Sequence, residues 1–347
     1  MDLPQTQLTQ GGNALLKAAE PVYLRALSPK DSRWDDKRFQ ADRFKALYQG
    51  TKYECYAVRI AECSCRLLFA FQVNDTGLCN LKLQAAKFCR VRLCPVCQDR
   101  RSMMWRGKAF KILPKVLEDF PKARFIFLTL TVKNCPLPEL RETLDKMHKA
   151  WMRLTKRKEF AAIDGWIKSV EVTRGHDDTA HPHYHCLLMV KSSYFTGDRY
   201  VSQERWSEAW KNSLRIEYNP IVDVRAVKPK KGTPEDEQQL AVMAAIVETI
   251  KYTSKPSDVL QEDKLSSVAA IASNQEWLLG LTEQLHKTRA IATGGVLKQY
   301  LKLLEDEPED LIHVDENGLT EADPESPRIL FGWRERARRY AMESSDA

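Results

Sequence analysis

Three histidines that alternate along one short stretch have the clearest capacity for chemistry. His181, His183 and His185 lie in the sequence His-Pro-His-Tyr-His, which runs into the apolar residues 186–190. Side chains two apart in an extended strand point to the same face, so the three imidazoles share one face of a predicted strand. Two neutral imidazoles at this spacing form half of a site for a divalent cation. Three of the chain's seven histidines fall here, which favours a metal site over a strand of solvated histidines.

Cysteines form a second candidate metal site. Cys89, Cys94 and Cys97 are separated by four and two residues, and the Cys-Pro-Val-Cys knuckle has the spacing of a zinc site. Candidates for the fourth ligand are Cys63, Cys65 and Cys79. Buried cysteines without a metal are the alternative, but the residues around this group are basic rather than apolar, which favours Zn²⁺.

Basic residues crowd the same stretch. Between residues 87 and 111 there are eight lysines and arginines and one acid, Asp99. The predicted contacts to DNA are Arg90, Arg92, Arg100 and Arg101, whose guanidinium groups suit backbone phosphates and guanine edges. Acidic residues gather late, between residues 305 and 316, and the formal net charge is +7. This distribution is typical of a body that binds nucleic acid and a tail that repels it, although a solvated charged surface is the alternative.

A third candidate group lies on a predicted helix that begins with the cap Thr-Pro-Glu-Asp at residues 233–236. The expected buried stripe of this helix is Leu240, Met243, Val247 and Ile250. Glu248, Tyr252 and Lys255 follow one another on a different face. An activated tyrosine is a competent nucleophile, a carboxylate one turn earlier can act as a general base, and a lysine one turn later can hold a phosphate. Beside a histidine strand, these residues indicate phosphoryl transfer.

The elements that must position these residues follow a βαββαβ order. We expect strands at 124–132, 166–174, 183–190 and 221–227, with helices at 138–157 and 203–214. This order predicts an α+β fold, a split-βαβ, ferredoxin-like antiparallel sheet with helices on one face and the other face open for a ligand. An N-terminal Cys-rich module precedes this core, and a mostly helical C-terminal region follows it.

Taken together, these segments resemble the HUH endonucleases, which nick single-stranded DNA through a 5′-phosphotyrosine. The likeness is greatest to the single-tyrosine replication initiators of small rolling-circle plasmids. The segments that carry it are FCRVRLCPVCQDRRS (88–102), FLTLTV (127–132), EVT (171–173), HPHYHCLLMV (181–190), VETIKYTSKPSD (247–258) and RAIATGGVLK (289–298). They occur in the order of that family and extend from about residue 63 to 304.

The resemblance implies roles for the candidate residues. Tyr252 would be the nucleophile, and Glu248 would activate water at termination in place of a second tyrosine. His183 and His185 would ligate Mn²⁺ or Mg²⁺, with Glu171 as the third ligand from the neighbouring strand. For the zinc site, CRLLF resembles the upstream cysteine segment of that family. Cys65 is therefore preferred as the fourth ligand beside Cys89, Cys94 and Cys97.

The resemblance also divides the chain. The expected parts are an N-terminal extension (1–50), a basic zinc and DNA-binding module (51–118), an HUH nickase domain (119–260), a helical part (261–304) and an acidic linker and tail (305–347). Within the last part, residues 332–342 are predicted to form a short basic helix.

Expected partners are plasmid origin DNA, as a single strand or an extruded hairpin, and a host helicase and DNA polymerase. No apolar run approaches the roughly 20 residues that a membrane span needs, and nine cysteines without a secretion signal favour the reducing cytoplasm. Two alternatives stay open. One is an HUH transposase or relaxase with the same chemistry, and the other is a non-catalytic zinc-dependent DNA-binding regulator that needs only the Cys-rich module.

Overall fold

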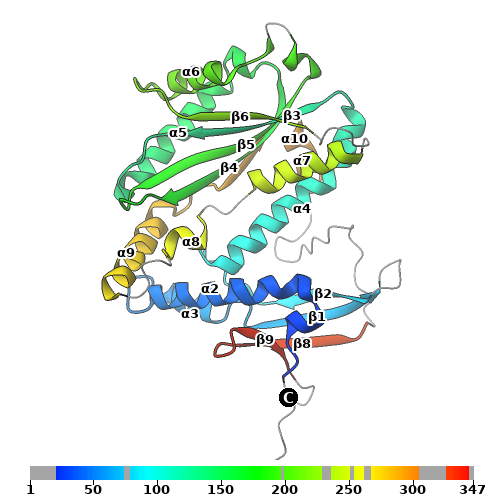
Figure 1. Ribbon diagram of the computed structural model, residues 1–347, viewed down its shortest axis with the longest axis vertical. Helices are drawn as coiled ribbons and strands as arrows, with labels where there is room; N and C mark the ends of the chain where they lie inside the picture. The colour runs from blue at the N-terminus through cyan, green and yellow to red at the C-terminus, as the bar shows by residue number, and fades with distance from the viewer. Residues whose placement is uncertain are drawn as a thin grey trace, which may run out of the picture.

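The computed structural model describes residues 21–73, 79–196, 199–228, 236–250, 254–261, 267–304 and 326–343. Within these residues the chain forms two antiparallel sheets, one of five strands and one of four. Figure 1 shows the five-stranded sheet at the top, the four-stranded sheet at the bottom and the long helix α4 (Pro95–Asp119) running between them. The predicted nucleophile Tyr252, the helix cap at 233–235 and the acidic residues 305–325 lie outside the described residues.

The five-stranded sheet confirms the predicted split-βαβ fold. Its strands are β3 (Arg124–Thr131), β4 (Ile163–Arg174), β5 (Ala180–Val190), β6 (Val222–Val227) and β7 (Ile291–Gly294). Their order is β6-β3-β5-β4-β7, and every neighbouring pair is antiparallel. Helix α5 (Leu140–Leu154) joins β3 to β4, and α6 (Gln203–Leu214) joins β5 to β6. The histidine strand β5 is therefore central, between β3 and β4.

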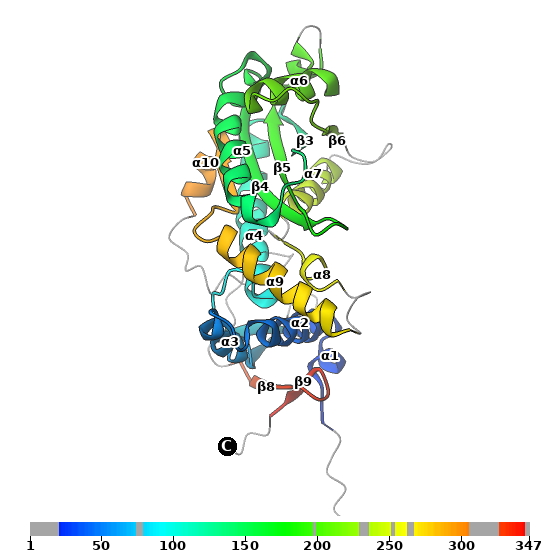
Figure 2. The same cartoon turned by 90° about the vertical axis from the view of Figure 1, so that its left-hand side faces the viewer.

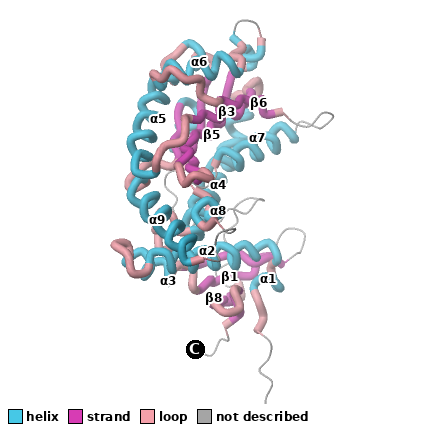
Figure 3. Tube along the Cα trace, turned by 60° about the vertical axis from the view of Figure 1, so that its left-hand side comes forward, coloured by secondary structure: helices cyan, strands magenta, loops and turns pink. Residues whose placement is uncertain are grey.

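Helices cover both faces of this sheet. On one face, Trp151 of α5 packs edge-on against Tyr184 of β5, with 6.2 Å between ring centroids. The helices on the other face are α4, α7 (Asp236–Thr249) and α10 (Gly295–Lys302). There, Leu187 and Met189 of β5 are buried with Val242 of α7, and Figures 2 and 3 show α5 and α7 on opposite sides of the sheet.

The expectation of an open second face is therefore wrong over this part of the sheet. Residues 186–190 are buried on both faces, which explains why their sequence is continuously apolar instead of alternating. Along β5, the face that carries Leu187 and Met189 has polar side chains only toward the start of the strand, where the histidines lie.

The four-stranded sheet combines the Cys-rich module with the end of the chain. Its strands are β1 (Arg66–Val73), β2 (Cys79–Ala86), β8 (Arg328–Arg334) and β9 (Arg339–Met342), in the order β2-β1-β8-β9. The helix predicted over 332–342 is wrong. Phe331 of β8 is fully buried edge-on against Phe69 of β1, with 5.8 Å between ring centroids, and this packing requires an extended chain.

Short and medium helices complete the structure. They are α1 (Leu24–Leu27), α2 (Arg33–Tyr48), α3 (Glu54–Ala61), α8 (Pro256–Val259) and α9 (Val268–Gln284), with 3₁₀ turns at Pro29–Ser32, Leu137–Glu139, Lys158–Phe160 and Ser192–Phe195. Figure 3 shows α8 and α9 between the two sheets. None of the helices in the described part of the chain is long and apolar enough to cross a membrane.

Candidate catalytic and metal centres

Glu171, His183 and His185 converge at one end of the five-stranded sheet. The pairing of β4 with β5 places Glu171 opposite His183, and His185 follows on the same face. Oε2 of Glu171 lies 3.2 Å from Nε2 of His183 and 2.7 Å from Nε2 of His185. The three side chains are buried, with exposed fractions of 2%, 9% and 8%. The structure therefore brings together the three ligands that the family resemblance implies.

This donor set fits a divalent cation. One carboxylate oxygen and two imidazole nitrogens lie within 4.8 Å of one another, a combination that suits Mn²⁺ or Mg²⁺ with further positions for water or phosphate. Burial alone would raise the pKa of Glu171, but hydrogen bonds with His183, His185 and Lys255 hold that pKa well below its ordinary value. The carboxylate is thus ionised and ready to bind a cation.

Lys255 approaches the same carboxylate from another element. Its Nζ lies 3.0 Å from Oε1 of Glu171. The ion pair raises the pKa of Lys255 above its ordinary value, and its side chain is 43% exposed, so the ammonium group stays charged beside solvent. The structure therefore places Lys255 at the triad, where it can face a phosphate that binds the same cation.

Helix α7 differs from its prediction at its C-terminal end. It ends at Thr249, and Lys255 has an extended backbone because the next residue, Pro256, disfavours a helical conformation there. The proposed continuous face of Glu248, Tyr252 and Lys255 on one helix is therefore wrong. Glu248 is exposed on the last turn of α7, whereas Tyr252 lies outside the described residues.

The buried stripe of α7 is also corrected. Leu240 and Val247 are 59% and 39% exposed, while Val242, Ile246 and Ile250 are buried against the sheet. Ile250 of the predicted stripe is buried and Met243 is half-buried, so the observed stripe overlaps the predicted one but is turned around the axis toward Val242 and Ile246. Residues 240–243 are four apolar residues in succession, so helical periodicity fits either of two buried faces equally well, and the sequence alone does not distinguish them.

Four cysteines form the second centre, between the two sheets. Their sulfur atoms lie close together, with 3.6 Å from Cys63 to Cys97, 3.5 Å from Cys89 to Cys97 and 3.8 Å from Cys94 to Cys63. A disulfide needs about 2.05 Å. A tetrahedron with Zn–S bonds of about 2.3 Å has edges of about 3.8 Å, which the cluster approaches. The arrangement is that of a metal site with four thiolate ligands.

The fourth cysteine is Cys63, which corrects the preference for Cys65. Ser64 between them has a left-handed backbone, with φ of +50°, so the chain turns sharply and points the two thiols apart. Two interactions hold the turn: the hydroxyl of Tyr340 in β9 donates to the Ser64 carbonyl at 2.6 Å, and Arg38 donates to the Cys63 carbonyl at 2.6 Å. The side chain of Cys79 lies outside the described residues.

Serine substitutions at Cys63 and Cys65 should have unequal effects. We expect Cys63→Ser to lower bound zinc from about one ion per chain to near zero. The free energy of unfolding should fall by about 2 kcal/mol or more, because metal binding in such sites is also folding energy. Cys65→Ser, a matched control two residues away, should leave both values unchanged. Zinc content by elemental analysis and thermal unfolding measure the difference, and a larger loss in Cys65→Ser would reverse the assignment.

The four arginines predicted to contact DNA occupy different environments. Arg90 is exposed and Arg101 half-buried. Arg100 is packed on the rings of Trp34 and Phe88, 5.9 and 5.3 Å from their centroids. Arg100 is thus held in the module by stacking, which sequence spacing alone cannot reveal.

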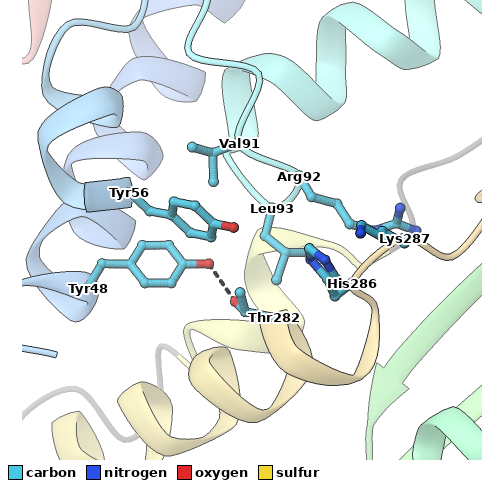
Figure 4. Close-up of a pocket in the computed structure, with 8 residues that line it drawn as sticks. All are labelled: Tyr48, Tyr56, Val91, Arg92, Leu93, Thr282, His286 and Lys287. Carbon is cyan, nitrogen blue, oxygen red and sulfur yellow. Dashed lines mark hydrogen bonds between the residues drawn. The ribbon is translucent and has the colours of Figure 1, made fainter. Parts of the chain in front are cut away.

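Arg92 is also used internally. It donates to the carbonyl of Thr288 at 2.6 Å and to its hydroxyl at 2.9 Å, and burial lowers its pKa to about 10. Figure 4 shows Arg92 in the wall of a cavity of about 170 Å³, together with Tyr48, Tyr56 and His286. The residues that line this cavity do not include the triad, so it is separate from the candidate catalytic centre. Through its hydrogen bonds with Thr288, Arg92 connects the cysteine knuckle to the segment that follows α9.

A comparison with known families identifies the family to which the chain belongs. Residues 80–341 match the Rep_1 family, described as replication protein, and the chain is a member of this family. It is similar to Protein rep of Streptococcus pneumoniae serotype 2, with 36% identity over 285 residues that cover 80% of this chain and 81% of that protein.

Other relatives give the same result. Protein rep of Lactiplantibacillus plantarum is 37% identical over 262 residues, 73% of this chain and 79% of that protein. A replication protein of Staphylococcus aureus is 32% identical over 230 residues, 64% of this chain and 93% of that protein. No solved structure matches the chain significantly.

Proposed function

We propose that this chain initiates rolling-circle replication of a plasmid by nicking one strand of the origin through Tyr252. The observation that supports this best is the ion pair between Lys255 and Glu171, because it brings the segment that follows Tyr252 to the metal triad. Membership of a family of replication proteins favours the same function.

In the proposed reaction, the phenol oxygen of Tyr252 attacks the scissile phosphorus. A bond forms between that oxygen and the phosphorus, which remains on the new 5′ end of the strand, while the bond from phosphorus to the 3′ oxygen of the preceding nucleotide breaks. The phenol loses its proton and the departing 3′ oxygen gains one, so the strand ends in a free 3′-hydroxyl. That hydroxyl would prime synthesis of the leading strand.

The triad would hold Mn²⁺ or Mg²⁺ during this step. Such an ion polarises the scissile phosphate and neutralises charge in the transition state. Glu171, His183 and His185 would hold it from two adjacent paired strands. Lys255 would contact a phosphate oxygen beside the triad, because its ammonium group is exposed at that edge.

Glu248 is proposed to activate the water that ends the cycle. We expect Glu248→Gln to leave the first nick within about twofold of the unchanged protein and to slow the water-dependent second cleavage by about 10²- to 10⁴-fold, the usual value of a general base. To measure the second cleavage, a preformed covalent adduct is given a second origin oligonucleotide, and the rate at which the cleaved product is released is followed. Glu208→Gln, an exposed glutamate on α6, is the control. Equal second cleavage in Glu248→Gln would assign Glu248 a surface role only.

The four-cysteine cluster is proposed to hold Zn²⁺ in the reducing cytoplasm, where thiols remain available as ligands. Arg90 and Arg101, on the loop and helix that this cluster organises, would contact phosphates of the origin, as a single strand or an extruded hairpin. A host helicase and DNA polymerase would then extend the 3′-hydroxyl.

The test is a nicking reaction on single-stranded oligonucleotides that tile a plasmid origin known to replicate with this protein. The protein is incubated with Mn²⁺, and covalent adducts are separated on a denaturing gel and located by mass spectrometry. An adduct on Tyr252 that disappears with EDTA supports the proposal. Cleavage without an adduct would indicate a simple metal-dependent phosphodiesterase, and binding without cleavage would favour a zinc-dependent regulator. Joining of unrelated strands would favour a transposase or relaxase.

A further inference from the structure

Helix α4 connects the two metal centres physically. It begins at the cysteine knuckle, with Cys97 in its first turn, and its 25 residues extend about 37 Å. Its far half is buried under the five-stranded sheet, where Ile112, Leu113 and Val116 pack in the same cluster as Leu187 of β5. One helix, with Pro114 in its far half, therefore begins at the cysteine knuckle and packs against the five-stranded sheet.

Arg106, in the middle of α4, binds the end of α7. Its Nε donates to the carbonyl of Ile250 at 3.0 Å, and its Nη2 donates to the carbonyl of Val247 at 3.3 Å. The last carbonyls of a helix have no partner within the helix, and a guanidinium group can satisfy two of them and favour the negative end of the helix dipole. Arg106 therefore binds the C-terminal end of α7 through these two carbonyls.

Two further contacts hold the same segment. Ser169 of β4 donates a short hydrogen bond to the carbonyl of Thr249. Gln98 of α4, next to Cys97, donates to the carbonyl of Ser254 at 3.4 Å and to that of Leu93 in the knuckle at 3.3 Å. Gln98 and Ser254 are both buried, with exposed fractions of 4% and 1%.

These contacts lie on both sides of the residues that carry the proposed nucleophile. Ile250 is held two residues before Tyr252, and Ser254 two residues after it. Two residues of chain span at most about 7 Å, so these two contacts limit the distance of the nucleophile from each held residue. Misplacement of a reacting group by about 1 Å can slow an enzymatic reaction by about 100-fold.

From this geometry we infer that Arg106 and Gln98 are positioning residues for Tyr252, and that the four-cysteine cluster acts on the nicking step through α4 as well as on DNA binding. The inference rests on the proposed function. It assigns the cysteine module a role in catalysis, because the helix that begins in the knuckle contacts Ile250 and Ser254, which precede and follow the nucleophile in the sequence.

The test is single-turnover adduct formation at a series of DNA concentrations with the full-length protein. We expect Arg106→Ala to lower the rate at saturating DNA by about 10- to 100-fold. The half-saturating DNA concentration and the affinity for Mn²⁺, measured by electron paramagnetic resonance, should change by less than about twofold. Arg106→Lys, which keeps one donor and the charge, should recover part of the rate.

Lys115→Ala is the matched control. It removes one positive charge from an exposed position on the same helix, where Lys115 pairs with Glu118 and Asp119. Its rate, DNA affinity and Mn²⁺ affinity should equal those of the unchanged protein. If Arg106→Ala does not fold at the assay temperature, Gln98→Leu and Arg106→Lys provide the same comparison.

Different outcomes separate the inference from the proposed function. A raised half-saturating concentration with an unchanged maximal rate would make Arg106 a DNA contact and overturn the inference, as would unchanged kinetics in all of these variants. If the unchanged protein forms no adduct on Tyr252 with its own origin, the proposed function itself fails.

Discussion

Tyr252→Phe should abolish the covalent adduct and lower strand nicking by about 10⁴-fold or more. The phenol oxygen is the atom that bonds to phosphorus, and loss of a nucleophile removes the covalent route completely, as in other enzymes that depend on one. The measurement is single-turnover cleavage of a labelled origin oligonucleotide with Mn²⁺. Binding of the same oligonucleotide should remain within about twofold, because a single hydroxyl is lost.

Tyr218→Phe is the control for this substitution. Tyr218 lies between α6 and β6 of the five-stranded sheet, and its hydroxyl accepts a hydrogen bond from the backbone N–H of Lys133 at 3.2 Å. Loss of that hydroxyl should leave the rate of adduct formation unchanged. Adduct formation that persists in Tyr252→Phe would show that another residue is the nucleophile and would contradict the proposed reaction.

Glu171→Ala should remove the catalytic cation. Even ligands of the second coordination sphere change metal affinity by about 10- to 100-fold, so loss of a direct carboxylate ligand should lower Mn²⁺ affinity by at least about 100-fold. Nicking at a fixed, moderate Mn²⁺ concentration should fall to a similar extent. Titration calorimetry with Mn²⁺ and single-turnover cleavage measure the two effects.

Glu159→Ala is the control, because it removes a buried carboxylate that is not part of the triad. Glu159 is also buried and paired, with its Oε2 3.1 Å from Nε of Arg157, so the loss of a buried negative charge is matched. Its Mn²⁺ affinity should equal that of the unchanged protein. If Glu171→Ala retains full Mn²⁺ affinity, the triad is not the cation site, and the hydrogen bonds to His183 and His185 serve only to stabilise the sheet.

Much of the catalytic sheet could be predicted from the sequence because its signals are local. Alternation in residues 124–131 and the helical spacing of Leu144, Met147 and Trp151 each reflect one buried face, and the structure has β3 and α5 there. The spacing of His183 and His185 likewise specifies a shared face, and pairing with the preceding strand places Glu171 opposite them.

The remaining features depend on contacts between distant segments. Cys63 differs from Cys65 only through the left-handed turn at Ser64, and that turn is held by Tyr340, 276 residues later. Arg92 and Arg100 have the spacing of a DNA-binding surface, yet their partners are Thr288 in one case and aromatic rings in the other. Thr288 and Trp34 lie 196 and 66 residues from these arginines, beyond any local window of sequence, although Phe88 lies only 12 residues from Arg100.

The misassigned C-terminal strands have the same cause. Residues 328–334 alternate weakly, and their basic and aromatic composition is compatible with a helix. Pairing with β1 decides the outcome, because it satisfies the backbone groups of an otherwise open strand edge and buries Phe331. Local periodicity contains no information about pairing with a strand that is distant in the sequence, so it could not predict these strands.

The pairing of β1 with β8 has a consequence for the synthesis of the protein. The five strands of the sheet that carries the triad all lie before residue 295, whereas the four-stranded sheet is complete only once residues 328–342 have been translated. The Ser64 turn that orients Cys63 also depends on Tyr340. A chain terminated before residue 328 would therefore lack strands β8 and β9 and the Tyr340 hydrogen bond at the turn beside Cys63.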